Sequence, residues 1–202
     1  MVQITRYFTQ SKPAVGDGKP RPEGEIEQFF RHHIFVVLGE PGLGKTTSFE
    51  YAAKQEKDAV FVRIGEFLSA PSIEFLKGKV LYLDGLDEHR SRANGMDIMD
   101  ALVGRLKALD SPKARISCRT AEWHGGKDLS ALSAVSNDTP VVQLDLARLK
   151  QEDFLKLVPN SSDFVEGAHN KGLDEFLNNP QDFLLLHEFY SEINRWPDNR
   201  SD

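Results

Sequence analysis

Cysteine and long apolar runs are nearly absent from this sequence. The single cysteine, Cys118, has no second cysteine for a disulfide, and a thiolate zinc site would lack its ligands. The longest apolar runs, such as Ile34–Leu38 and Phe183–Leu186, are far too short to cross a bilayer, and the N-terminus lacks a signal-peptide apolar region. We therefore expect a cytoplasmic protein without a membrane partner.

An excess of basic charge is also absent. The chain has 25 Lys and Arg against 31 Asp and Glu, a formal net charge of −6, which does not support direct binding of nucleic acid. Its six histidines lack the paired spacing of metal ligands, and we assign none to a metal. With 202 residues, 40% of them hydrophobic, the chain has room for one α/β domain and a small helical annex.

The order of segments predicts a parallel sheet covered by helices. Residues 11–25 are rich in Pro, Gly and Lys, so residues 1–25 are predicted to be an N-terminal segment and linker. Residues 26–147, the predicted core, alternate short apolar segments with helical patterns. The helical patterns continue alone through residues 148–202, which predicts a helical annex. The predicted strands are Ile34–Leu38, Ala59–Ile64, Val80–Leu83, Ala114–Cys118 and Val141–Leu144.

A glycine-rich loop lies between the first predicted strand and a predicted helix. Glycines let several backbone N–H groups converge on one anion, and the helix N-terminus adds a favourable dipole. Lys45 would neutralise the β- and γ-phosphates and so assist catalysis, and the Thr46 hydroxyl would ligate Mg²⁺. An incidental lysine in a glycine-rich loop would not explain the strand and helix on either side, so we predict a site for ATP or GTP. Its predicted nucleotide contacts are Gly39, Glu40, Pro41, Gly42, Leu43, Gly44, Lys45, Thr46 and Thr47.

An acidic motif ends the third predicted strand. Asp84, at the carboxyl end of this strand, is predicted to hold the Mg²⁺ together with Thr46. Either Asp87 or Glu88 could orient or polarise the attacking water; we prefer Glu88, and Asp87 remains the alternative. Two acidic residues alone could also cap a helix or lie in solvent. The nearby phosphate loop favours the catalytic interpretation.

These motifs resemble those of the NACHT type of signal-transduction ATPases with numerous domains (STAND), which are P-loop NTPases related to AAA+ ATPases. The segment Asp84-Gly85-Leu86-Asp87-Glu88 has the spaced acidic pattern of NACHT domains, whereas AAA+ ATPases have an adjacent Asp-Glu pair. Residues 116–123 are similar to bacterial members. The resemblance covers about residues 26–200. It implies ATP or ADP as ligand and a three-layer α/β P-loop sandwich whose five-stranded parallel sheet has the order 5-1-4-3-2.

The resemblance implies two further site residues. Arg119, after the fourth predicted strand, looks like the catalytic sensor 1 arginine that reads the γ-phosphate. Pro180 lies in a segment that looks like the annex motif whose proline contacts the adenine. Each also has a local explanation, as a surface charge or as a helix start. Arg90 and Arg92 could reach a neighbouring subunit's nucleotide, but we favour a solvated surface for both.

Three functions remain open from the sequence. The leading hypothesis is a nucleotide-gated switch with slow ATP hydrolysis. The resemblance extends it to bacterial defence or signalling, with self-association or further domains, since family members normally carry a winged-helix domain and sensor repeats. The second is an AAA+-like ATPase that loads or remodels nucleic acid or protein complexes. The third is a scaffold that binds nucleotide without turnover. The sequence does not identify the signal that triggers the switch, the effector activity or the oligomeric state.

Overall fold

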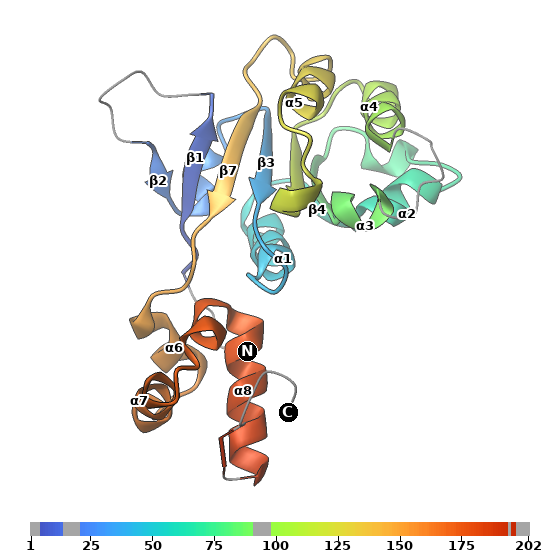
Figure 1. Cartoon of the computed structure of the whole chain (residues 1–202). Coiled ribbons are helices and arrows are strands. Elements are labelled where there is room, and N and C mark those ends of the chain that lie inside the picture. The colour runs from blue at the N-terminus through green and yellow to red at the C-terminus, as the bar shows by residue number, and fades with distance from the viewer. Residues whose placement is uncertain (1–4, 14–20, 91–97, 194, 197–202) are drawn as a thin grey trace. The chain divides into compact units, whose positions relative to one another are not determined.

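The computed structural model describes residues 5–13, 21–90, 98–193 and 195–196 (Figure 1). These form two compact units. One contains residues 6–41 and 45–147 and carries the sheet; the other contains the Gly42–Gly44 turn and the chain from Arg148 onward. In the described part of the chain, no helix is both long and apolar enough to cross a bilayer.

The sheet contains all five strands that the sequence predicts, with small changes at their ends. They are β3 (Ile34–Leu38), β4 (Ala59–Arg63), β5 (Val80–Asp84), β6 (Ala114–Cys118) and β7 (Val142–Leu146). They run parallel in the spatial order β7-β3-β6-β5-β4. Every residue of β3 and β6 is buried, as expected for central strands covered on both faces.

The prediction of a five-stranded sheet with the order 5-1-4-3-2 is wrong, because two further strands belong to the sheet. Strand β1 (Phe8–Lys12) pairs antiparallel with β7, and β2 (Glu23–Gly24) pairs antiparallel with β1, so the sheet has seven strands. Both lie within residues 1–25, which the sequence predicts to be an N-terminal segment and linker. Phe8 and Gln10 point inward from β1, and the strand covers backbone groups that would otherwise leave β7 as an open edge. The polar residues of this short strand concealed it.

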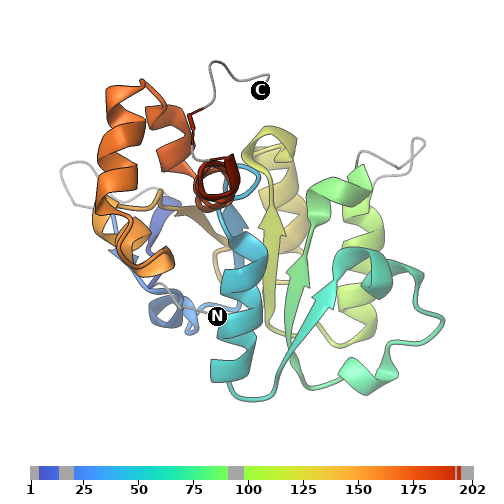
Figure 2. The ribbon, with the colours of Figure 1, turned by 90° about the horizontal axis from the view of Figure 1, so that it is seen from below.

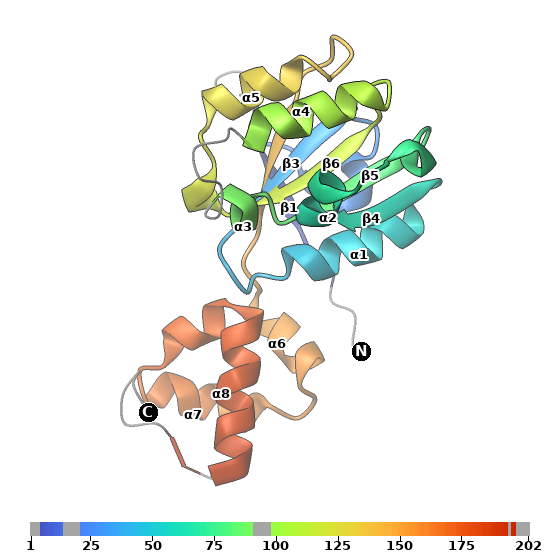
Figure 3. The same cartoon turned by 90° about the vertical axis from the view of Figure 1, so that its right-hand side faces the viewer.

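Helices cover both faces of the sheet (Figure 3). Helix α1 (Lys45–Gln55) packs against β4 and β5 on one face, and α4 (Ile98–Ala108) and α5 (Gly126–Ser133) lie together on the other. Met99, Leu102, Val103 and Leu106 form the buried face of α4, at the spacing of an amphipathic helix. Asn94-Gly95, which precede this helix in the sequence, lie outside the described residues. The shorter elements are η1 (Ile26–Phe29), α2 (Ile64–Ser69), η2 (Glu74–Leu76), α3 (Leu86–Arg90) and η3 (Thr120–Glu122).

The second unit has a core of its own. Its helices are α6 (Gln151–Leu157), α7 (Ser162–Asn170), η4 (Asp174–Asn178) and α8 (Pro180–Ile193), which carry the orange and red colours in Figure 2. They pack around Phe183, whose ring lies 4.7 Å from that of Phe154 and 5.7 Å from that of Phe164. The ring of Trp196 stacks on Phe164 at 5.1 Å. Aromatic packing therefore organises this unit.

Candidate functional site

The phosphate loop connects β3 to α1, as the sequence predicts. It leaves the strand at Gly39, and the helix begins at Lys45. Gly42 and Gly44 have φ angles of 76° and 90°, in the left-handed region that residues with a Cβ rarely adopt. Glycine at both positions therefore permits the turn that brings the backbone round to the helix N-terminus.

Lys45 folds back onto its own loop. Its Nζ donates to the carbonyl oxygens of Gly39 at 2.7 Å and Glu40 at 3.0 Å. Burial lowers the pKa of Lys45, while the carboxylate of Asp87 raises it and the guanidinium of Arg119 lowers it. These neighbours come from separate elements, so Lys45 lies among the predicted catalytic groups. Two carbonyl dipoles satisfy its charge only in part, and a phosphate would do so more fully.

Two hydroxyl groups hold the carboxylate of Asp84 at the end of β5. Thr46 Oγ1, in the first turn of α1, donates to Asp84 Oδ2 at 2.7 Å. Ser117 Oγ, on the adjacent strand β6, donates to Asp84 Oδ1. The same Ser117 oxygen accepts a hydrogen bond from the Gly85 N–H at 2.9 Å. The structure thus brings the two predicted metal-linked residues together and adds Ser117, which the sequence did not single out.

The Thr46 hydroxyl and the Asp84 carboxylate fit Mg²⁺. They lie 2.7 Å apart, and P-loop proteins offer this cation a hydroxyl and a strand-end carboxylate, with phosphate oxygens and water completing its shell. Among the described residues there is no group of three or more His, Cys, Asp or Glu side chains that could hold a metal. The hydroxyl and the carboxylate are two oxygen ligands of the kind that Mg²⁺ accepts.

Asp87 and Glu88 have different surroundings. Asp87 is 5% exposed; its Oδ2 forms an ion pair with Arg119 Nε at 2.7 Å, and its Oδ1 accepts a hydrogen bond from the Arg119 backbone N–H at 3.1 Å. The Arg119 side chain is 48% exposed, so about half of it remains open to solvent. Glu88 is exposed, and no other described side chain forms an ion pair with its carboxylate. The Asp87 carboxylate therefore contacts Arg119, whereas the Glu88 side chain is exposed to solvent.

The favoured prediction of a solvated Arg90 is wrong. Its two Nη atoms donate to the two carboxylate oxygens of buried Asp128 at 2.7 and 2.8 Å, and it also donates to the Glu122 carbonyl. Arg90 therefore joins α3 to α5 and to the segment after β6. The bidentate geometry suits a structural pair and leaves the guanidinium poorly placed to act in another subunit. Arg92 lies outside the described residues.

Pro180 is the first residue of α8, in the second unit. The side-chain oxygen of Asn179 accepts a hydrogen bond from the Gln181 N–H at 2.9 Å, as residues at helix N-termini commonly do. A proline at this first helical position has a local explanation. Its contact with adenine stays a prediction.

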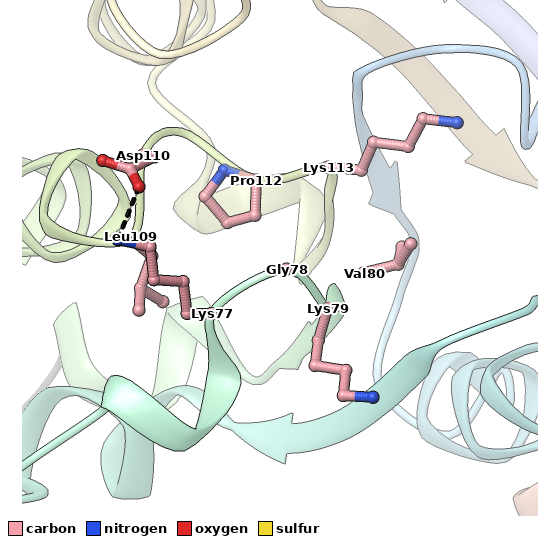
Figure 4. A pocket seen from close by; sticks show the side chains of 8 residues that line it. All are labelled: Lys77, Gly78, Lys79, Val80, Leu109, Asp110, Pro112 and Lys113. Carbon is pink, nitrogen blue, oxygen red and sulfur yellow. Dashed lines mark ion pairs between the residues drawn. The ribbon is translucent and has the colours of Figure 1, made fainter.

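A hollow of about 370 Å³ lies at the opposite ends of the strands, before β5 and β6 (Figure 4). Its lysines do not converge on a ligand. Lys77 is paired with Asp110 at 2.8 Å, and the amino groups of Lys79 and Lys113 extend away from each other. We therefore do not place the site there.

Comparison with known proteins adds little beyond this geometry. No protein-family model and no curated protein matches the chain. Twelve chains of solved structures match it, among them AMPPCP-bound DnaA from Aquifex aeolicus, with 14% identity and a TM-score of 0.44. That match covers 79% of this chain and 55% of the DnaA chain, so this chain spans about half of that length. A mainly parallel sheet between helices, with a glycine-rich loop after its first parallel strand, is consistent with a P-loop NTPase-like fold.

Proposed function

We propose that this chain binds ATP with Mg²⁺, hydrolyses it slowly, and acts as a nucleotide-gated switch. The contact of 2.7 Å between Thr46 Oγ1 and Asp84 Oδ2 carries the proposal. It joins the helix that follows the glycine-rich loop to the carboxyl end of β5, two places far apart in the sequence. A P-loop NTPase requires these two groups at one point.

The proposed role of each site residue follows from its place in the phosphate loop or at the end of β5. The backbone N–H groups of residues 39–47, apart from Pro41, which has none, would surround the phosphates, and Lys45 would exchange its two loop carbonyls for phosphate oxygens. Thr46 and Asp84 would hold the cation. When bound, Mg²⁺ would neutralise charge on the β- and γ-phosphates and fix their orientation. ADP would occupy the same site after hydrolysis.

Glu88 is the residue that we propose to orient or deprotonate the attacking water. A general base needs a free acceptor oxygen close to the water, and exposed Glu88 offers one. Both oxygens of Asp87 already contact Arg119, one in an ion pair with Nε and the other by accepting a hydrogen bond from the backbone N–H, so we propose that Asp87 holds that arginine in place. The exposed part of Arg119 would then contact the γ-phosphate and report whether it is present.

In its finer form the proposal is a NACHT-type domain of bacterial defence or signalling. The spaced acidic motif from Asp84 to Glu88 supports this form. Self-association or further domains, a cytoplasmic location, and an adenine contact by Pro180 belong to the same proposal.

Paired binding and hydrolysis measurements test the proposed function. Wild type should bind a fluorescent ATP analogue in Mg²⁺ and release phosphate slowly. Glu88→Gln should bind with an affinity within about twofold of wild type, because an amide leaves the phosphate loop intact, while its hydrolysis falls by about 10²–10⁴. Glu74→Gln, at an exposed glutamate of η2, is the matched control and should behave as wild type.

Two outcomes would redirect the proposal. Full hydrolysis by Glu88→Gln would remove Glu88 from the role of base and leave Asp87 as the candidate. Rapid hydrolysis that is stimulated by DNA or by a protein substrate would favour the AAA+-like loader or remodeller over the switch.

A further inference from the structure

Ser117 lies between the strand that carries the phosphate loop and the strand that carries the acidic motif. It belongs to β6, which pairs with β3 on one side and with β5 on the other. Its side chain is 1% exposed. A buried hydroxyl in this place has to find hydrogen-bond partners, and the partners that it finds are both at the end of β5.

The two hydrogen bonds of Ser117 fix its direction. A hydroxyl has one proton to donate, and this proton goes to Asp84 Oδ1. One of its lone pairs accepts from the Gly85 N–H at 2.9 Å, and that residue has a left-handed φ of 84°. The backbone turn after β5 therefore anchors the hydroxyl, and the hydroxyl anchors the carboxylate.

This arrangement assigns different tasks to the two oxygens of Asp84. Ser117 occupies Oδ1, and Oδ2 faces the Thr46 hydroxyl at 2.7 Å. A cation held by Thr46 would therefore meet Oδ2, directly or through a water. If the bond to Oδ1 were lost, the carboxylate could rotate about its χ2 angle, because that terminal torsion is broad for aspartate.

We infer that Ser117 is a positioning residue for the magnesium site: it keeps Asp84 Oδ2 directed at the cation that Thr46 binds. The inference rests on the proposed function. It concerns only the cation, since the hydrogen bonds of the Ser117 hydroxyl go to Asp84 and Gly85, at the end of β5. Removing the hydroxyl should weaken the contribution of Mg²⁺ to nucleotide binding and should leave metal-free nucleotide binding unchanged.

The test measures binding and does not depend on turnover. The dissociation constant of a fluorescent ATP analogue is determined in EDTA and across a Mg²⁺ titration, and Mn²⁺ affinity in the presence of nucleotide is measured by electron paramagnetic resonance. Ser117→Ala should need about tenfold more Mg²⁺ or Mn²⁺ for half-saturation, the lower end of the effect of losing a hydrogen bond to a metal ligand. Its affinity in EDTA should equal that of wild type.

Two further variants separate positioning from general stability. Ser117→Thr keeps the hydroxyl and should restore the cation dependence of wild type, and Ser117→Cys, a weak donor of similar size, should give a smaller shift than alanine. Ser136→Ala is the matched control, because Ser136 is equally buried and donates to the Ser133 carbonyl, outside the site. It should leave the cation dependence unchanged.

The outcomes distinguish this inference from the proposed function. If wild type binds nucleotide and Ser117→Ala shows the same cation dependence, or if Ser136→Ala shifts it equally, the positioning role is overturned and the proposed function stands. If Ser117→Ala does not fold, a cation dependence in Ser117→Cys identical to wild type overturns the role. If wild type binds no nucleotide, both proposals fall.

Discussion

Arg115 of β6 is a fully buried charge that pairs with Glu56, the residue that follows α1. It is 0% exposed, and its guanidinium forms two hydrogen bonds with the Glu56 carboxylate, at 2.8 and 3.2 Å. The Tyr82 hydroxyl donates to the same carboxylate at 2.7 Å. Arg115 also donates to backbone carbonyls just before β3, those of Phe30, His32 and His33. The group joins β6 and β5 to the end of the helix that begins at the phosphate loop.

Glu56→Gln should destabilise the fold by about 3 kcal/mol. Removing one partner of a buried ion pair costs about 3–5 kcal/mol, because the other charge stays buried without compensation. The carbonyl bonds remain, as does the contact of Arg115 with the Phe35 ring at 4.5 Å, so the lower end of that range applies. At about 2–4 °C per kcal/mol for a chain of this size, the melting temperature should fall by about 6–12 °C.

Urea unfolding followed by circular dichroism measures this change, and calorimetry gives the melting temperature. Glu50→Gln, at an exposed position of the same helix, should change stability by less than about 0.5 kcal/mol. The double variant Glu56→Gln with Arg115→Met should recover part of the loss, since the uncompensated charge is gone. A loss below about 1 kcal/mol in Glu56→Gln would refute the reasoning that the buried charge depends on its partner.

Three other predictions concern protonation, accessibility and nucleotide discrimination. Burial lowers the pKa of His32 and His33 below the ordinary 6.5, so their contribution to stability is complete above that pH and is lost as the pH falls through the lowered values. Replacing both with Gln should therefore reduce the fall in melting temperature between about pH 7.5 and about pH 5. A fall equal to that of wild type would contradict a contribution from the two histidines. Burial raises the pKa of Cys118 to about 12, so a thiol reagent should modify it only in denaturant, and reaction of the native protein would contradict its burial. Arg119→Ala should bring the affinities for ATP and ADP closer together, and an unchanged ratio would exclude a γ-phosphate sensor.

The central strands could be predicted because their residues form short apolar or alternating runs. Ile34–Leu38 is apolar throughout, as in a strand covered on both faces, and Ala114–Cys118 alternates small or apolar residues with Arg115 and Ser117. Every residue of strand β1 except Phe8 is polar, and its pairing with β7 depends on a contact between the two ends of the sheet-bearing unit. A pattern confined to a short window does not contain that information.

The site likewise combines local motifs, which the sequence pattern reveals, with contacts between distant segments, which it does not. The glycine-rich loop and the acidic motif are local sequences whose chemistry is evident from residue type and spacing. Ser117 contacts Asp84 because β5 and β6 are adjacent in a parallel register that places Leu83 beside Ile116. The pairs of Asp87 with Arg119 and of Arg90 with Asp128 likewise join segments more than thirty residues apart. These contacts depend on the register and packing of elements, which the sequence pattern alone does not determine.

Nucleotide binding by the loop is the central claim, and the ATP affinity of a lysine variant tests it most directly. In calorimetric titrations with Mg²⁺, wild type should bind ATP, and Lys45→Ala should lose at least about 100-fold in affinity, which corresponds to about 2.7 kcal/mol. Lys54→Ala, at an exposed lysine in the last turn of α1, should bind as wild type does. Equal ATP affinity in Lys45→Ala and wild type would contradict the assignment of this loop as the phosphate site.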